Sequence, residues 1–242
     1  MPILDVHHTE DRWGGAANVA ANLASLGARV TLLCAGSYEN LSSPNIEVEC
    51  TGGPNTVKTR LWCDNRMLAR YDENVTFRED SVMVDRFKSI YADFPYIVFC
   101  DYGRGVLTCI APMLDLTYRK GTSTIVDPKG KDWGKYENAW MIKANHQEWQ
   151  EAIRRPSVRR LVVTHQGQRV FMSSREDASV AFDVPKVPVV DPTGCGDSFL
   201  AAMAYHLLQG GTVYDAVLRG IAGGSAAVQH QGTYILKPED IK

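Results

Sequence analysis

This 242-residue sequence lacks the features that mark nucleic-acid-binding, membrane-spanning or disulfide-stabilised proteins. Its formal net charge is -2 and its pI is about 6.3, so the chain lacks the excess of positive charge that is typical of proteins that bind nucleic acids. It contains no apolar run long enough to span a bilayer, and no signal-peptide pattern opens it. The six cysteines include no C-x-x-C pair, and most lie in apolar runs. We therefore expect reduced cysteines that act as small apolar residues in a cytoplasmic protein.

The composition and the order of segments are typical of a globular enzyme. Hydrophobic residues make up 45% of the chain, which is enough for one sizeable core. Short β-branched runs alternate with helical segments, as in the strand at 96–100 and the helix at 110–120, and this predicts an α/β fold with a mainly parallel sheet. Three further strand-like runs, at 46–50, 56–63 and 67–71, predict a small antiparallel flap, which would form a lid over one end of the sheet. We expect one domain, 1–242, with lid strands at about 45–72.

The most informative segment runs from Val190 to Phe199. A strand end is followed by a Gly-bearing turn and then by a helical apolar run. Backbone N–H groups at a helix N-terminus attract anions, and the small residues Gly194, Cys195 and Gly196 would let a phosphate approach closely. Asp197 lies in the same first turn, where a carboxylate can orient an attacking hydroxyl for phosphoryl transfer. The structural alternative is a capped turn with Asp197 as a helix-dipole partner.

A second glycine-rich segment, Gly14-Gly15-Ala16-Ala17-Asn18, opens a predicted Ala-rich helix. Paired glycines permit close backbone approach, and Asn18 offers both a donor and an acceptor to a hydroxyl-rich ligand. The structural alternative is a Gly-initiated helix that packs tightly on the sheet.

These two segments carry a family resemblance. Asp191 to Phe199 matches D-[TP]-T-G-x-G-D-[ST]-F, which resembles the C-terminal signature of ribokinase/PfkB-type sugar kinases, with Cys195 where alanine is usual. Gly14 to Gly27 resembles the sugar-binding motif of that family, most closely in the kinase domains of ADP-heptose synthases. The resemblance implies a ribokinase-like three-layer sandwich, with Asp197 as catalytic base and an anion hole at residues 194–196.

The activity implied by the resemblance is ATP-dependent phosphorylation of a sugar or sugar phosphate. Heptose 7-phosphate, phosphorylated at the anomeric hydroxyl, is the first candidate acceptor, and another furanose or a nucleoside is the second. The rival interpretation is a binding protein that kept the fold and lost turnover. The implied cofactors are ATP and Mg²⁺, with K⁺ as a further candidate. The implied partner is a small-molecule sugar, with no nucleic acid and no membrane, and the lid suggests a homodimer.

Further segments resemble the family in the right order. Asp101-Tyr102-Gly103-Arg104-Gly105-Val106-Leu107 resembles D-Y-G-K-G-V-L, Asp127-Pro128-Lys129-Gly130 matches D-P-K-G, and Asn145 to Glu148 fits N-x-x-E. Asn145 and Glu148 also fit a helix capping box, and both readings stay open. The lid cations Lys58 and Arg60 share one strand face, where they suit either a phosphorylated sugar or solvent. The resemblance implies substrate contacts at Gly14, Gly15, Asn18, Lys58, Arg60, Asp101 and Arg104. It implies nucleotide contacts at Lys129, Asn145, Glu148, Thr164 and Gly167. It also implies Mg²⁺ held through water at Glu148 and a monovalent cation at Asp191.

The sequence departs from the family pattern at its start. Members of the family normally begin with a strand and a G-D-x-x-x-D segment that contributes a sugar-binding Asp. Only Met1 to Trp13 precede Gly14, so we expect the first βα unit to be missing. The sugar side of the site is therefore expected to be reduced, whereas the nucleotide side is complete.

Overall fold

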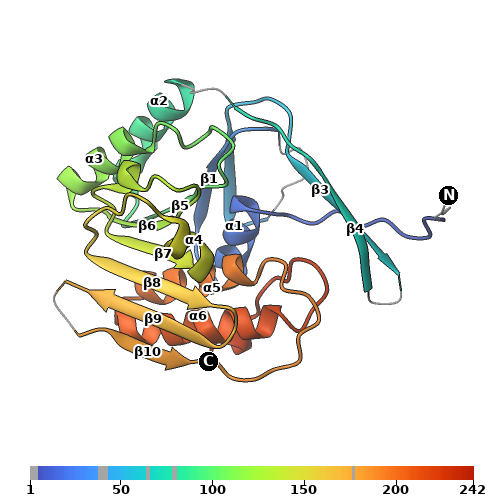
Figure 1. Cartoon of the computed structure of the whole chain (residues 1–242). Coiled ribbons are helices and arrows are strands. Elements are labelled where there is room, and N and C mark those ends of the chain that lie inside the picture. Colours follow the sequence, from blue (N-terminus) through green and yellow to red (C-terminus); the bar gives the residue numbers. More distant parts are fainter. Residues whose placement is uncertain (1–4, 38–42, 64–65, 78–80, 176–177) are drawn as a thin grey trace.

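The computed structural model describes residues 5–37, 43–63, 66–77, 81–175 and 178–242, and it confirms the expected α/β architecture with a mainly parallel sheet (Figure 1). The central sheet has six strands in the order β10-β9-β8-β7-β6-β5. The strands β5 to β8 run parallel, whereas β9 and β10 are antiparallel additions at one edge. The bounds are β5 Tyr96–Cys100, β6 Ser123–Asp127, β7 Met141–Asn145, β8 Arg160–His165, β9 Arg169–Ser174 and β10 Val180–Asp183.

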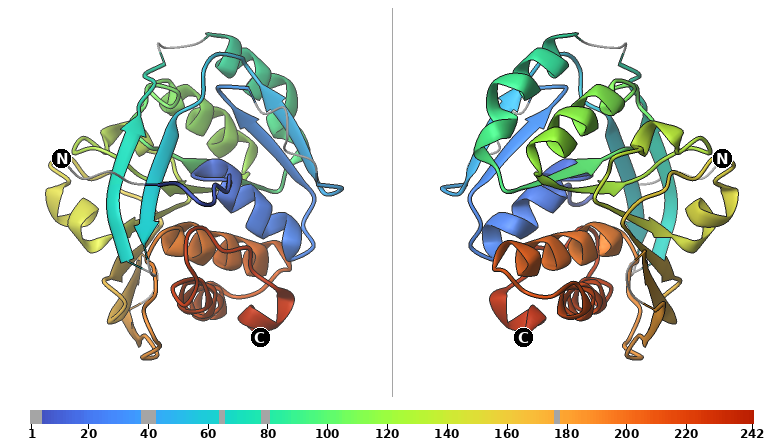
Figure 2. Two further views of the ribbon diagram at one scale, coloured as in Figure 1. Left: turned by 90° about the vertical axis from the view of Figure 1, so that its right-hand side faces the viewer. Right: turned by 90° about the vertical axis from the view of Figure 1, so that its left-hand side faces the viewer.

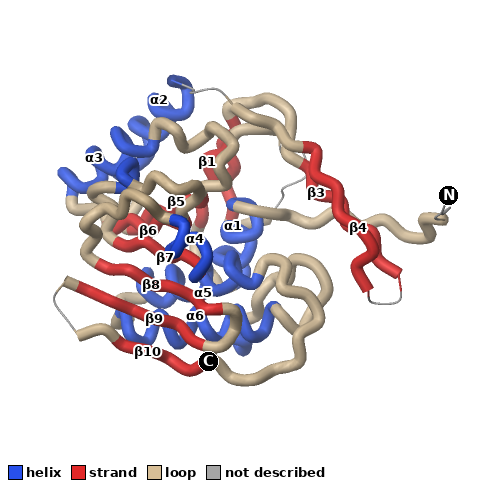
Figure 3. The backbone as a smooth tube through the Cα atoms, viewed as in Figure 1, coloured by secondary structure: helices blue, strands red, loops and turns tan. Residues whose placement is uncertain are grey.

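Helices cover both faces of this sheet (Figure 3). One face is covered by α2 Ser81–Ile90, α3 Ile110–Lys120 and α4 His146–Glu151. The other face is covered by α1 Ala16–Ser25, α5 Cys195–Leu208 and α6 Val213–Ala227. Three short 3₁₀ helices complete the helical elements of the described residues: Tyr91–Asp93, Gly134–Tyr136 and Pro238–Ile241. Within these residues no helix is both long and apolar enough to cross a membrane.

The strand sequences account for the two-faced core. Successive side chains of a strand point to opposite faces, so a strand buried on both sides is apolar throughout. In β6, Ile125 packs with α5 and α6 whereas Val126 packs with α2 and α3. The helices α5 and α6 pack closely because Gly220 leaves room for Phe199, whose ring lies 2.9 Å from where a Cβ would stand.

Two small two-stranded sheets flank the central one. The strand β1 (Val30–Cys34) pairs in parallel with β2 (Ile46–Cys50), and β3 (Val57–Cys63) pairs antiparallel with β4 (Arg66–Glu73). The sequence predicts that residues 46–50 belong to the antiparallel flap, and this prediction is wrong, because β2 pairs in parallel with β1. The reason is apolar burial, since β1 and β2 pack against the alanine face of α1. The lid therefore consists of β3 and β4, which stand away from the body of the molecule (Figure 1). The left view of Figure 2 shows the two strands side by side in front of it.

The hairpin of β8 and β9 was not predicted from the sequence. Its turn has Gln166 and Gly167 in the left-handed region, with φ of 43° and 68°, and Gln168 N–H donates to the His165 carbonyl over 2.8 Å. Such turns suit the twist of a hairpin. The side chains of Val170 and Met172 then point into the core.

Candidate active site

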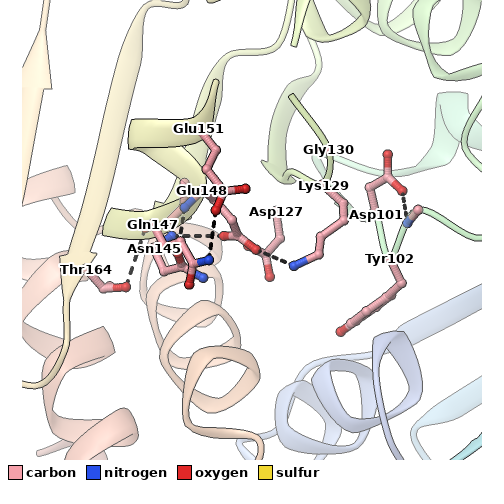
Figure 4. A network of polar contacts seen from close by, with 12 residues as sticks. Asp101, Tyr102, Asp127, Lys129, Gly130, Asn145, Gln147, Glu148, Glu151 and Thr164 are labelled. Carbon is pink, nitrogen blue, oxygen red and sulfur yellow. Dashed lines mark hydrogen bonds and ion pairs between the residues drawn. The ribbon is translucent and has the colours of Figure 1, made fainter. Parts of the chain in front are cut away.

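The sequence-predicted residues meet beyond the carboxyl ends of β5, β6 and β7, opposite the N-terminus of α5 (Figure 4). Asp101 and Tyr102 follow β5, Asp127 ends β6, and Asn145 ends β7. In open α/β sheets this edge is where ligands bind, because the loops that follow parallel strands converge there.

The carboxylate of Asp197 has a donor at each oxygen. The Asn18 side-chain amide donates to Oδ2 over 3.0 Å, and the Tyr102 hydroxyl donates to Oδ1 over 3.0 Å. Burial raises the pKa of Asp197 above its ordinary value, and these two donors and the charge of Lys143 partly oppose that rise. Burial also raises the pKa of Tyr102, so the phenol stays protonated and donates. Asp197 is thus a half-buried, fixed carboxylate at a helix N-terminus.

Asn22 fixes the orientation of Asn18. Both asparagines are fully buried on α1, one helical turn apart. The Asn22 amide nitrogen donates to the Asn18 side-chain oxygen over 3.1 Å, so the nitrogen of the Asn18 amide must face Asp197. Asn22 is held in turn by Leu236 N–H, which donates to its side-chain oxygen over 2.8 Å. We did not identify Asn22 from the sequence, although its i, i+4 spacing from Asn18 was a usable signal.

The loop before α5 has the geometry of an anion cradle. Gly194 is the N-cap of α5 with φ of 77°, and a Cβ there would stand 2.9 Å from the Asn18 amide nitrogen, so only glycine fits. Cys195 begins the helix, and its N–H donates to the Pro192 carbonyl over 3.3 Å. The first-turn N–H groups of Gly196 and Asp197 have no carbonyl one turn earlier in the helix, so they are available to an anion at this helix end.

Lys143 lies directly beneath this cradle. Its ammonium is 3.3 Å from Asp127 Oδ1 and 3.3 Å from where a Cβ of Gly196 would stand. Burial disfavours the ammonium, but the carboxylates of Asp127, Asp197 and Glu148 outweigh that effect and raise the pKa of Lys143. Burial raises the pKa of Asp127 to about 6, and the other two carboxylates add to the rise. A permanent positive charge therefore stands behind the cradle. We found no signal for Lys143 in the sequence, and we named Asp127 in the D-P-K-G motif without assigning it a role, because a strand position alone does not reveal which loop covers it.

Asp191 holds the loop before α5 in place through hydrogen bonds to backbone N–H groups. It is 3% exposed, and its two oxygens accept from Thr193 N–H over 2.9 Å and from Gly232 N–H over 2.8 Å. Burial works against its charge, yet these backbone donors outweigh burial and lower the pKa of Asp191. Because each oxygen keeps further lone pairs, a cation contact at Asp191 stays a prediction.

Asn145 and Glu148 form the capping box that the sequence allowed. Asn145 Oδ1 accepts from Glu148 N–H over 2.8 Å, and Glu148 Oε2 accepts from Asn145 N–H over 3.1 Å. The remaining oxygen of Glu148 accepts from Lys129 Nζ over 2.9 Å (Figure 4). The three predicted nucleotide residues are therefore brought together in one contact network.

Thr164 and Gly167 lie farther along the same edge. Thr164 is the penultimate residue of β8, and its hydroxyl donates to the Ala144 carbonyl over 3.4 Å. Gly167 lies in the turn that follows the strand. Beside them opens a pocket of about 490 Å³ lined by His146, His165, Gln168, Arg169 and Phe171.

Asp101 lies buried between the end of β5 and the 3₁₀ helix Gly134–Tyr136. Its carboxylate accepts from Lys135 Nζ over 2.5 Å, from the Tyr136 hydroxyl over 2.7 Å and from Gly103 N–H over 2.7 Å. These bonds fix the start of the Tyr102 loop. Arg104, two residues beyond Tyr102, ties that loop toward the lid, because its carbonyl accepts from Phe77 N–H over 2.7 Å.

The lid strand β3 brings the ammonium group of Lys58 close to Tyr102, the residue that donates to Asp197. Lys58 Nζ lies 5.9 Å from the centre of the Tyr102 ring. Burial lowers the pKa of Lys58, and the charges of Arg70, Arg60 and Arg104 lower it further. Asp72, which faces Lys58 in the lid pairing, opposes that effect. Lys58 is therefore close to the loop that carries Tyr102, and a joint phosphate site of Lys58, Arg60 and Arg104 stays a prediction.

The glycines at the start of α1 differ in their surroundings. Gly15 is the N-cap of α1 with φ of 58°, and a Cβ there would stand 3.1 Å from the Tyr102 ring. Gly15 is therefore needed both for its backbone conformation and for the close approach of Tyr102. A Cβ on Gly14 would meet nothing within 4 Å, which leaves open space next to the site.

Among the residues that the structure describes, no group of three or more His, Cys, Asp or Glu side chains is arranged to hold a metal ion directly. Glu148 has both oxygens engaged by Lys129 and Asn145. This donor set fits a divalent cation held mainly through water and through the phosphates of a nucleotide, which is the usual mode for Mg²⁺.

The sequence is similar to that of known carbohydrate kinases. Residues 125–240 match the model described as pfkB family carbohydrate kinase. The bifunctional protein HldE of Salmonella dublin is 26% identical over 272 residues, which covers 100% of this chain and 57% of that protein. HldE of Salmonella newport gives the same identity and coverage. The chain thus spans little more than half the length of these curated relatives.

The fold also matches solved kinase structures. Phosphofructokinase-2 from Escherichia coli in complex with potassium has a TM-score of 0.77 and 21% identity, and the match covers 93% of this chain and 84% of that chain. Ribokinase from Thermotoga maritima has a TM-score of 0.73 and 16% identity, with the same coverage. The predicted ribokinase-like fold is therefore confirmed.

Proposed function

We propose that this chain carries a pfkB-family carbohydrate kinase domain and that it transfers the γ-phosphoryl group of ATP to a hydroxyl of a sugar or sugar phosphate. The observation that carries the proposal is the Asp197 carboxylate, held by Asn18 and Tyr102 beside the open N-terminus of α5. A base and an anion cradle side by side are what phosphoryl transfer requires.

In the proposed reaction, the acceptor hydroxyl takes the place of one donor at Asp197 and gives its proton to the carboxylate as its oxygen attacks the γ-phosphorus. The bond between the γ-phosphorus and the β,γ-bridging oxygen breaks, and ADP leaves. The raised pKa of Asp197 makes it a better proton acceptor than an ordinary aspartate. The N–H groups of Gly196 and Asp197, with Lys143 behind them, stabilise the charge on the moving phosphoryl group.

Nucleotide binding is assigned to Lys129, Asn145 and Glu148, with Thr164 and Gly167 at the side of the pocket near His165. Mg²⁺, when bound, would neutralise charge on the nucleotide phosphates, and Glu148 with Asn145 would hold it through water. A monovalent cation at Asp191 is a further proposal, supported by the buried carboxylate under the cradle loop.

The acceptor is proposed to carry its own phosphate, as heptose 7-phosphate does. The support is the cation set at the lid: Lys58 Nζ lies 5.9 Å from the centre of the Tyr102 ring, and the loop of Tyr102 also carries Arg104. Burial lowers the pKa of Lys58, and the charges of Arg70, Arg60 and Arg104 lower it further. The similarity to HldE directs the first choice to a heptose phosphate, and the similar phosphofructokinase-2 was solved in complex with fructose-6-phosphate. Another free furanose or a nucleoside is the second choice.

The test is an ADP-release assay over matched pairs of free and phosphorylated sugars, with wild type, Arg104→Ala and Lys58→Ala. A lost charge-assisted bond to phosphate costs about 1.5–3 kcal/mol, or roughly ten- to a hundred-fold in kcat/KM, and only for the phosphorylated sugar. Lys88→Ala, at an exposed pair on α2, is the control and should leave both sugars unaffected. Equal losses on both sugars would reject the phosphate site. ATP binding without turnover of any sugar would instead favour a binding protein.

We also propose that the lid mediates a homodimer. Its exposed apolar residues are Val57, Met67, Leu68 and Tyr71, each at least 45% exposed. Sedimentation analysis of wild type and of Leu68→Ser would test this, because a dimer that depends on the lid should dissociate in the variant. ATP and sugar phosphates are intracellular metabolites, so the proposed reaction implies a cytoplasmic site of action.

A further inference from the structure

Cys34 and Cys50 face each other at the ends of two neighbouring strands. They are direct partners in the parallel pairing of β1 with β2, and their sulfur atoms are 3.5 Å apart. Paired strands lie about 4.8 Å apart, which is within the Cα separation that a disulfide accepts. Side-chain rotation is therefore the main movement needed to join the two sulfur atoms.

The two thiols differ in access and in chemical state. Cys34 is buried at 8% exposure, whereas Cys50 is exposed. Burial and the neighbouring Cys50 raise the pKa of Cys34, and its thiol donates to the Glu49 carbonyl over 3.8 Å. An oxidant from solution therefore reaches Cys50 first, and Cys34 stands behind it as the second sulfur.

We propose that Cys34 and Cys50 form a reversible dithiol–disulfide site that is oxidised by hydrogen peroxide. The inference concerns a surface away from Asp197 and does not depend on the proposed kinase function. It also departs from our expectation that every cysteine serves only as a small apolar residue. The spacing of sixteen residues gave no signal in the sequence, because the pairing arises from strand register.

The reaction has two steps. The Cys50 sulfur, as thiolate, attacks one peroxide oxygen, so an S–O bond forms, the O–O bond breaks, and the released hydroxide takes up the thiol proton as water. The Cys34 sulfur then attacks the sulfenic sulfur of Cys50. The S–S bond forms, the S–O bond breaks, and the departing hydroxide takes the Cys34 proton as a second water. Two thiols lose two electrons in total, and one peroxide is reduced to two waters.

The position of the pair favours reversibility. Adjacent parallel strands hold the two Cβ atoms at a separation set by the sheet and not by the disulfide, and a disulfide away from its preferred geometry is more readily reduced. The site also lies where it connects two functional parts of the chain. Cys34 packs with Ala17 and Ala20 of α1, the helix that carries Asn18, while β2 leads through residues 51–56 into the lid strand β3.

The experiment oxidises the folded protein with one equivalent of hydrogen peroxide, blocks remaining thiols with N-ethylmaleimide, and maps the peptides by mass spectrometry with and without reduction. We expect one cross-linked peptide pair joining Cys34 to Cys50, short by two hydrogen atoms and reopened by dithiothreitol. The control Cys63→Ser, which removes another exposed cysteine on β3, should behave as wild type. Oxidation of Cys50 to sulfinic acid with Cys34 still free, or pairing of Cys50 with any other cysteine, would overturn the proposal.

A second measurement works even if cross-linked peptides are hard to recover. Dimedone traps sulfenic acid, so Cys34→Ala should accumulate a Cys50 adduct about tenfold or more above wild type, where the adjacent sulfur removes the sulfenic acid first. The conservative Cys50→Ser should leave Cys34 unoxidised. Equal trapping in wild type and Cys34→Ala would show that Cys34 does not react with Cys50.

Discussion

The change Asp197→Asn separates catalysis from folding in this chain. It removes the carboxylate that we propose as general base, and such a base contributes about 10²–10⁴-fold to the rate. We expect kcat to fall by that amount while nucleotide affinity stays within about threefold, because Lys129, Asn145 and Glu148 are untouched.

The same change should not destabilise the fold, and the structure gives the reason. An asparagine oxygen can still accept from the Asn18 amide, and its NH₂ group can donate to the Tyr102 hydroxyl once that hydroxyl rotates. The folded-state pKa of Asp197 is raised above 3.8, so the charged carboxylate costs stability at neutral pH, and that cost is relieved as the pH falls through the folded pKa. The amide carries no such cost.

The assay therefore has two readouts. Differential scanning fluorimetry at pH 7 should give a Tm equal to or above that of wild type, and the difference should shrink at lower pH. ADP release should fall by the stated factor. Asp183→Asn, at an exposed carboxylate of β10, is the matched control and should change neither quantity. Near-wild-type turnover would remove Asp197 from the mechanism, and a clearly lower Tm would refute the account of its environment.

Three further predictions follow from the same site. Gly196→Val should weaken nucleotide binding and turnover more than folding, since its Cβ would stand 3.3 Å from the Lys143 ammonium, and calorimetric ATP affinity in the folded variant checks this. Lys143→Met should lower the free energy of unfolding in urea by about 3–5 kcal/mol by leaving Asp127 unpaired, and adding Asp127→Asn should recover most of the loss. Because the folded pKa of Asp127, about 6, exceeds its unfolded value of 3.8, its protonation stabilises the fold as the pH falls from 6 toward 3.8, and Asp127→Asn should remove that part of the stability profile.

Much of the site could be predicted because it is local in sequence. The start of α5 is set by consecutive residues, so the small residues at 194–196 and the carboxylate of Asp197 could be placed on one helix end from the sequence alone. The capping box of Asn145 and Glu148 is local for the same reason, since an N-cap and its N3 residue lie three positions apart. The alternation of strands and helices likewise predicted the parallel sheet.

What the sequence left undecided depends on contacts between distant segments. Asn18 and Asp197 are 179 residues apart and Tyr102 and Asp197 are 95 apart. The packing of α1 against α5, and the position of the loop after β5 beside the start of α5, bring these side chains within 3.0 Å. The same holds for β2, which we predicted from the sequence to lie in the antiparallel flap and which instead pairs in parallel with β1. Local sequence sets helix ends and turns because their hydrogen bonds join near neighbours. Tertiary packing decides which of those ends face each other, and so it decides which carboxylate is held as a base and which lysine stands behind the cradle.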